Sequence, residues 1–196
     1  MIKYIKYIVF LSVTTGLFAC GNDSQHAEEH EHHDHQEAEL TAQSDMQFHG
    51  SAEFNEDIER ATEQYFMLSA ALVEDNVEDA ARHSAAMREI LADADADELN
   101  EQALNFWSEQ WGTINTRARA LEEEIDIEAQ RFEFEFLSDA MIELIEGFDP
   151  LSFDVYIQRC PMVRDGSADW VSRSEDILNP YHGDRMLTCG SVIRKI

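Results

Sequence analysis

The sequence predicts a mainly α-helical fold, an antiparallel bundle of about four helices followed by a small irregular C-terminal segment with a short strand. Three observations lead to this prediction. Apolar residues recur in steps of three and four from Phe54 onward, which is the spacing of one face of a helix. The helical segments have similar lengths and short connections, as in an up-and-down bundle. After Pro150 the pattern changes to the alternation that is typical of a strand.

The first two helices are predicted from their apolar faces and from a start signal. The inward residues expected for the first helix are Phe54, Ile58, Ala61, Tyr65, Leu68 and Leu72. Asp75 with Glu78 resembles a capping box and predicts the start of the second helix. The inward residues expected there are Val77, Ala80, Met87 and Leu91.

The Asp95/Asp97 stretch is expected to start a third helix, and a fourth is expected from about Asp126 to Glu146, with Gly147 as its stop. The inward residues expected for these two helices are Trp107, Trp111, Ile114, Ala118, Leu121, Phe132, Phe136, Ala140 and Leu144. Residues 132–136 alternate Phe and Glu as a strand would, but the flanking helix formers favour a helix. Beyond Pro150, the alternation of Phe153, Val155 and Ile157 predicts a short strand.

Residues 1–20 have the pattern of a secretory signal peptide, with Lys3 and Lys6 before a mostly apolar, uncharged run. The run ends in Leu17-Phe18-Ala19-Cys20, which resembles the lipobox of bacterial lipoproteins. That resemblance implies that Cys20 becomes lipidated and anchors the chain to a membrane. Gly21 stands where inner-membrane lipoproteins have Asp, which suggests the outer membrane and its periplasmic face. The alternative is an ordinary cleaved signal that happens to contain a cysteine.

Residues 21–50 are polar and acidic, and they predict a flexible tether before a domain at residues 51–196. The tether carries five clustered histidines, His26, His30, His32, His33 and His35. Such a cluster can bind Zn²⁺, Cu²⁺ or Ni²⁺. The alternative is a solvated spacer with no role in metal binding in the cell.

The chain has a formal net charge of −27, which argues against nucleic acid or an anionic membrane surface as a partner. The sequence contains no Gly-rich phosphate loop, HExxH motif or GxSxG motif, so we expect no enzyme activity.

Two cysteines, Cys160 and Cys189, remain beyond Cys20, and two interpretations stay open. In an oxidising compartment the pair would form a disulfide. In the reduced state the thiols could instead bind a soft metal such as Cu(I). The candidate ligands of that site are Cys160, Met162, His182, Met186 and Cys189.

Four C-terminal motifs resemble domain-of-unknown-function family 3347. They are Cys160-Pro161-Met162, Trp170-Val171-Ser172, Asn179-Pro180-Tyr181 and Met186-Leu187-Thr188-Cys189-Gly190. His182 departs from the pattern, because the family usually has an aromatic residue there. The family occurs in small exported proteins and at the end of adaptor subunits of copper and silver efflux pumps, so the resemblance implies a metal-handling context and no particular reaction.

We therefore expect a lipid-anchored periplasmic accessory protein that binds a heavy metal, copper or zinc, and that works with a metal efflux complex or another envelope protein. The alternative is a structural or protein-interaction module closed by a Cys160–Cys189 disulfide. Trp170 and Tyr181 are expected to cover the C-terminal segment against the bundle and not to bind a substrate.

Overall fold

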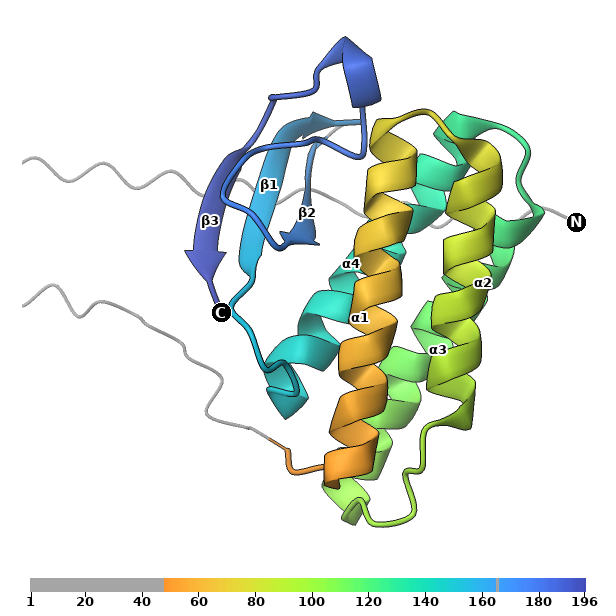
Figure 1. Cartoon of the computed structure of the whole chain (residues 1–196), viewed down its shortest axis with the longest axis vertical. Helices are drawn as coiled ribbons and strands as arrows, with labels where there is room; N and C mark the ends of the chain where they lie inside the picture. Colours follow the sequence, from red (N-terminus) through yellow and green to blue (C-terminus); the bar gives the residue numbers. More distant parts are fainter. Residues whose placement is uncertain (1–47, 165) are drawn as a thin grey trace, which may run out of the picture. The chain divides into compact units, whose positions relative to one another are not determined.

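Four helices form the first part of the described chain: α1 (Ala52–Val73), α2 (Val77–Asp93), α3 (Glu101–Glu123) and α4 (Ile127–Phe148) (Figure 1). The computed structural model describes residues 48–164 and 166–196, which lie in the second of the chain's two units, Gln43–Ile196. Consecutive helices pack side by side, and α1 also contacts α4. The mainly α-helical bundle predicted from the periodicity is confirmed.

Each helix begins at a polar residue that caps its free backbone N–H groups. Ser51 and Asp126 cap α1 and α4. The second helix begins after Asn76, whose side chain accepts from the Asp79 N–H at 3.1 Å, and not after Asp75 as predicted. The third begins after Asn100, which accepts from two N–H groups at 3.0 Å, so the predicted start at Asp95/Asp97 is also wrong.

The core follows the predicted face of α1, where all six expected residues are buried. The predicted inward face of α4 is wrong in part. Phe134 is fully buried and stacks on Tyr65 with ring centroids 5.2 Å apart. Phe132 is 41% exposed and Phe136 is half-buried, and the guanidinium groups of Arg164 and Arg117 cover their rings. The alternating Phe-Glu run offers an aromatic residue to both faces of the helix, so it does not identify the inward face.

The other expected core positions are buried, except Val77 and Trp111, which are half-buried. Gly147 does not stop α4, because the helix continues to Phe148 and ends at Asp149, which has a φ of 46°. A Cβ on Gly147 would lie 2.4 Å from the Phe106 ring, so this glycine permits close packing of α3 on α4.

Packing begins three residues before the predicted domain boundary. The backbone N–H of Phe48 donates to the Gly147 carbonyl at 2.6 Å, and the Phe48 ring lies 4.8 Å from that of Phe106. The chain is therefore attached to the ends of α3 and α4 before α1 begins.

A small antiparallel sheet follows the helices, with strand order β2-β1-β3. Its strands are β1 (Tyr156–Val163), β2 (Gly166–Ser172) and β3 (Ser191–Lys195), and a 3₁₀ turn, η1 (Gly183–Arg185), precedes β3. The single strand predicted over residues 153–157 is therefore shifted, because Phe153 and Val155 lie before β1. The prediction also missed the other two strands. The β1–β2 register shifts between Cys160 and Val163. Pro161 lies at this irregularity, where its missing N–H costs no regular ladder bond.

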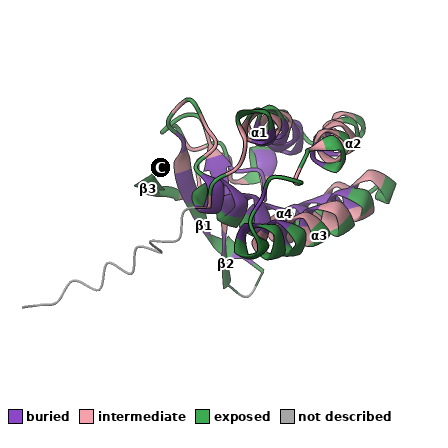
Figure 2. Cartoon of the chain, turned by 90° about the horizontal axis from the view of Figure 1, so that it is seen from below, coloured by how far each residue is buried: buried purple, intermediate pink, exposed green. Residues whose placement is uncertain are grey.

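The sheet packs on the bundle through β2, which contacts α4. The Val171 N–H of β2 also donates to the Tyr65 hydroxyl of α1 at 3.2 Å. Figure 2 shows buried residues gathered where the helices face one another and where the sheet faces the bundle. None of the helices in the described part of the chain combines the length and apolarity that crossing a membrane requires.

The two faces of α4 give a matched pair of variants. We expect Phe134→Ala to lower the free energy of unfolding by about 3–5 kcal/mol, because it leaves a cavity in the core. Phe132→Ala removes an exposed ring and should cost less than about 1 kcal/mol. Urea unfolding followed by circular dichroism measures both values, and equal losses would contradict this orientation of α4.

Candidate functional site

The structure brings Cys160 and Cys189 together, although they are far apart in the sequence. Both side chains are free thiols, and the pairing of Arg159 in β1 with Ser191 in β3 places the two cysteines near each other. Cys160 is fully buried in the central strand β1, and Cys189 is half-buried just before β3. Both interpretations of the pair, a disulfide or a shared metal ion, require this proximity.

Cys189 belongs to a segment, residues 173–190, that we call the strap, which leaves β2 and returns to β3 (Figure 1). Gln158 of β1 holds its start, since its Nε2 donates to the carbonyls of Ser174 and Asp176 at 2.7 and 3.2 Å. Alternate residues of a strand share a face, so Gln158 and Cys160 lie on the same face of β1. The strap therefore covers the face of the sheet that carries Cys160.

Asn179 fixes the part of the strap that contains Cys189. Its Nδ2 donates to the Cys189 carbonyl at 2.7 Å, and its Oδ1 accepts from the Tyr181 N–H at 2.8 Å. The Cys189 N–H donates to the Met186 carbonyl at 2.9 Å. A Cβ on Gly190 would lie 2.9 Å from the Arg159 carbonyl and 3.0 Å from the Trp170 ring, so only glycine lets the chain approach β1 this closely.

The remaining candidate ligands in this part of the chain are Met162, His182 and Met186. Met162 is 50% exposed, and the His182 Nε2 lies 3.1 Å from its backbone carbonyl. Met186 is half-buried in the strap. The His182 ring therefore contacts the backbone of Met162, and the Cys189 N–H bonds the backbone of Met186. Neither contact involves a methionine sulfur. Within residues 48–164 and 166–196, no three His, Cys, Asp or Glu side chains are grouped as a metal site.

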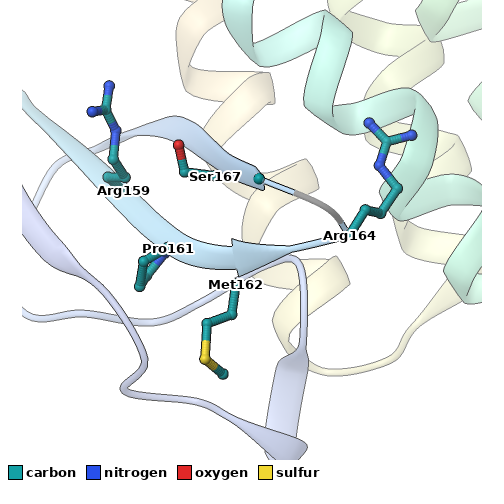
Figure 3. A pocket seen from close by; sticks show the side chains of 6 residues that line it. Arg159, Pro161, Met162, Arg164 and Ser167 are labelled. Atoms are coloured by element: carbon teal, nitrogen blue, oxygen red, sulfur yellow. The ribbon is translucent and has the colours of Figure 1, made fainter.

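A shallow depression of about 660 Å³ lies at the β1–β2 hairpin (Figure 3). Arg159 and Ser167 point to one side of the hairpin in Figure 3, and Met162 points to the other. Both arginines that line the depression are already paired, Arg159 with Asp169 at 2.6 Å and Arg164 with Glu135 at 2.5 Å. Their charge is therefore neutralised, and the depression offers little attraction to an anion.

A buried arginine joins the strap to the helices. Arg131 of α4 is 4% exposed, and its guanidinium donates to the carbonyls of Leu72 at 2.7 Å and Pro180 at 2.9 Å. It also pairs with the carboxylates of Asp75 at 2.5 Å and Glu128 at 2.8 Å. These acceptors belong to the end of α1, the α1–α2 turn, the strap and α4 itself. One side chain therefore holds the strap against two helices.

Gly183 makes room for this arginine. Its φ is +54°, and a Cβ there would lie 2.5 Å from the Arg131 Nη2. A glycine is required at this position for both reasons.

Tyrosines fill the space between the sheet and the bundle. The Tyr65 hydroxyl lies 2.7 Å from the Ser138 Oγ, and the Tyr181 hydroxyl donates to the Asp169 carbonyl at 2.5 Å. Burial raises the pKa of both tyrosines well above the usual value, so both stay neutral. Trp170 and Tyr181 are buried and meet edge to face at 5.9 Å, in agreement with their expected covering role.

The electrostatics at the pair favour protonated thiols. Burial raises the pKa of the Cys189 thiol, and the neighbouring Cys160 raises it further. Metal binding or oxidation must therefore displace these protons.

The sequence signals that predicted Cys160 and Cys189 did not identify the residues that position them. Arg131 appeared as an ordinary helix residue, and Gln158 lay just beyond the predicted strand and had no predicted role. Asn179 and Gly183 carried a signal, since Asn-Pro and an isolated Gly mark turns. The lipidation candidate Cys20 and the tether histidines His26, His30, His32, His33 and His35 lie outside the described residues.

Residues 61–152 match the model of a family described as protein of unknown function (DUF3347). This region of the chain belongs to the DUF3347 family. The match covers most of the helical bundle and ends before β1, so the C-terminal motifs that carried the resemblance lie beyond it. Comparisons with curated proteins and with solved structures gave no match.

The buried arginine Arg131 gives a stability prediction. Arg131→Met should lower the free energy of unfolding by about 3–5 kcal/mol, because the strap and the end of α1 lose the guanidinium that bonds both the Pro180 and Leu72 carbonyls. Arg185 also pairs with Glu128, but at the surface, so Arg185→Ala should cost less than about 1 kcal/mol. Chemical denaturation of both variants tests this, and a small loss for Arg131→Met would show that the strap does not depend on it.

Asp139 of α4 gives a pH prediction. Desolvation and the nearby carboxylates of Glu135, Asp169 and Glu143 raise its pKa to about 6, although part of the side chain remains exposed. Between this value and the usual value of about 3.9, the folded chain holds a proton that the unfolded chain releases. Its contribution to stability is therefore full below about pH 4 and is lost as the pH rises through 6.

We expect Asp139→Asn, which stays neutral, to stabilise the protein by about 1 kcal/mol at pH 7.5, after allowance for solvent screening. The gain over the parent chain should vanish near pH 4, where Asp139 itself is protonated. Urea midpoints of both proteins across this pH range provide the measurement. A gain that persists at pH 4 would assign the effect to packing and not to charge.

Proposed function

We propose that this DUF3347 protein is a non-enzymatic, lipid-anchored accessory protein that binds a soft heavy-metal ion through Cys160 and Cys189. The observation that carries the proposal is the close approach of the backbone around Cys189 to β1, where Arg159 pairs with Ser191 beside the two free thiols. Both backbones are fixed by hydrogen bonds, so the pair is preorganised and a metal need not order it.

The donor chemistry favours copper over zinc. Thiolate and thioether donors select Cu(I), and this part of the chain places Met162 and Met186 beside the cysteines in sequence. A zinc site in a protein usually takes four ligands, commonly with histidine among them. His182 supplies an imidazole at the strap, and its contact with the Met162 carbonyl would have to break for it to coordinate an ion.

The proposed setting follows from the first 50 residues. Lipid on Cys20 would hold the protein at the outer membrane with its domain on the periplasmic side. The five tether histidines would collect divalent ions near the membrane, and the net charge of −27 would concentrate cations around the protein. A metal efflux complex or another envelope protein is the proposed partner.

The second candidate is an interaction module without a metal, whose strap is closed by a Cys160–Cys189 disulfide. The hydrogen bonds of Arg131 favour this candidate, because they already attach the strap to the helical bundle. In that case reduction should lower the melting temperature and leave the metal content unchanged.

Competition with a chromophoric Cu(I) chelator tests the metal proposal. The full chain should carry Cys20→Ser, so that Cys160 and Cys189 are its only thiols. Under reducing conditions, we expect Cys160→Ser with Cys189→Ser to weaken Cu(I) binding by more than about 100-fold. A matched control replaces the five tether histidines with glutamine and should retain the tight site. Equal Cu(I) affinity in the cysteine double variant and its parent would exclude this site.

A further inference from the structure

We propose that Cys160 and Cys189 form an intramolecular disulfide that latches the strap onto β1 and excludes the metal, so that the site is gated by redox state. The gating rests on the proposed function, because it regulates the same two sulfurs. The latch itself rests on the geometry of the strap.

The backbones of both cysteines are held by hydrogen bonds. Cys160 lies in the central strand, where β1 pairs with β2 through Cys160 and Ala168 and with β3 through Arg159 and Ser191. The Cys189 backbone is held at both ends, its N–H by Met186 and its carbonyl by Asn179. These backbone contacts keep the two cysteines near each other while the strap is folded, which favours closure within one chain.

The two cysteines differ in access. Cys160 is fully buried and Cys189 is half-buried, so an oxidant in solution reaches Cys189 first. In the first step, the Cys189 thiolate attacks a small disulfide such as oxidised glutathione, forms a mixed disulfide and releases one glutathione thiolate. In the second step, the Cys160 thiolate attacks the Cys189 Sγ and releases the second glutathione. The protein loses two protons and two electrons, and the oxidant gains them as two thiols.

Closure changes both the strap and the metal site. A disulfide links the strap covalently to β1, next to the Trp170 ring that contacts Gly190. The same bond removes both thiolates, which are the donors that a soft metal requires. Oxidation should therefore stabilise the C-terminal segment and abolish Cu(I) binding together.

The test uses the full chain with Cys20→Ser, incubated with oxidised glutathione and then denatured with an alkylating reagent. We expect an intact mass lower by two hydrogens, no alkylated cysteine and a higher urea midpoint. Cu(I) affinity should fall by more than about 100-fold on oxidation, and a thiol reductant should restore it. The single variants separate the two steps: Cys160→Ser should accumulate a glutathione adduct on Cys189, and Cys189→Ser should remain largely unmodified.

Two results would overturn the latch: two alkylated thiols after oxidation, or disulfide-linked dimers. Oxidised protein that binds Cu(I) as well as reduced protein would overturn the gating. The failure of the proposed function looks different. If the disulfide forms but the reduced protein does not bind Cu(I), the metal function and the gating are wrong and the latch remains as a structural bond. If the reduced protein binds Cu(I) but no disulfide forms, the latch alone is wrong.

Discussion

The position of the C-terminal segment depends on one buried cation. Arg131 gives up its hydration, and that loss is offset only because acceptors from four parts of the chain surround it. The Leu72 carbonyl lies in the last turn of α1, where the helix dipole is negative, so a cation is favourable there. Gly183 leaves the space that the guanidinium needs. Helix ends, turn and strap are thus held by one side chain whose removal leaves several groups unsatisfied.

The position of Cys189 relative to Cys160 depends on these contacts of Arg131. Pro180 is held by Arg131, and its neighbour Asn179 is in turn bonded to the Cys189 carbonyl. The Tyr181 ring closes the remaining gap between β2 and α4 through Asp169 and Phe134. The Asn179–Gly183 run therefore fixes the backbone and the packing around Cys189. It contributes no sulfur ligand.

Periodicity predicted the helices, because an apolar face needs only local spacing, and the α1 face was correct at every expected residue. It was wrong where the local pattern is symmetric. In residues 132–136 both helix faces carry phenylalanine, and only the contact of Phe134 with Tyr65 of α1 decides between them. The helix starts shifted for a similar reason, since Asp75, Asn76, Asp95, Asp97 and Asn100 are all good caps. Arg131 could not be predicted, because its acceptors are brought together only by the folded chain.

Under the proposed function and its redox gating, three processes would compete for the same two sulfurs: protonation, metal binding and disulfide formation. Burial and the mutual proximity of the thiols raise the pKa of Cys189, which favours the protonated pair over both of the others. A soft cation overcomes this preference through strong bonds to thiolate, and the acidic surface raises its local concentration. An oxidant would overcome the preference for protonated thiols by forming the disulfide, which lasts until a reductant breaks it. Because the strap already places the two cysteines near each other as free thiols, we expect the surroundings of the protein to decide the outcome without a change of its fold.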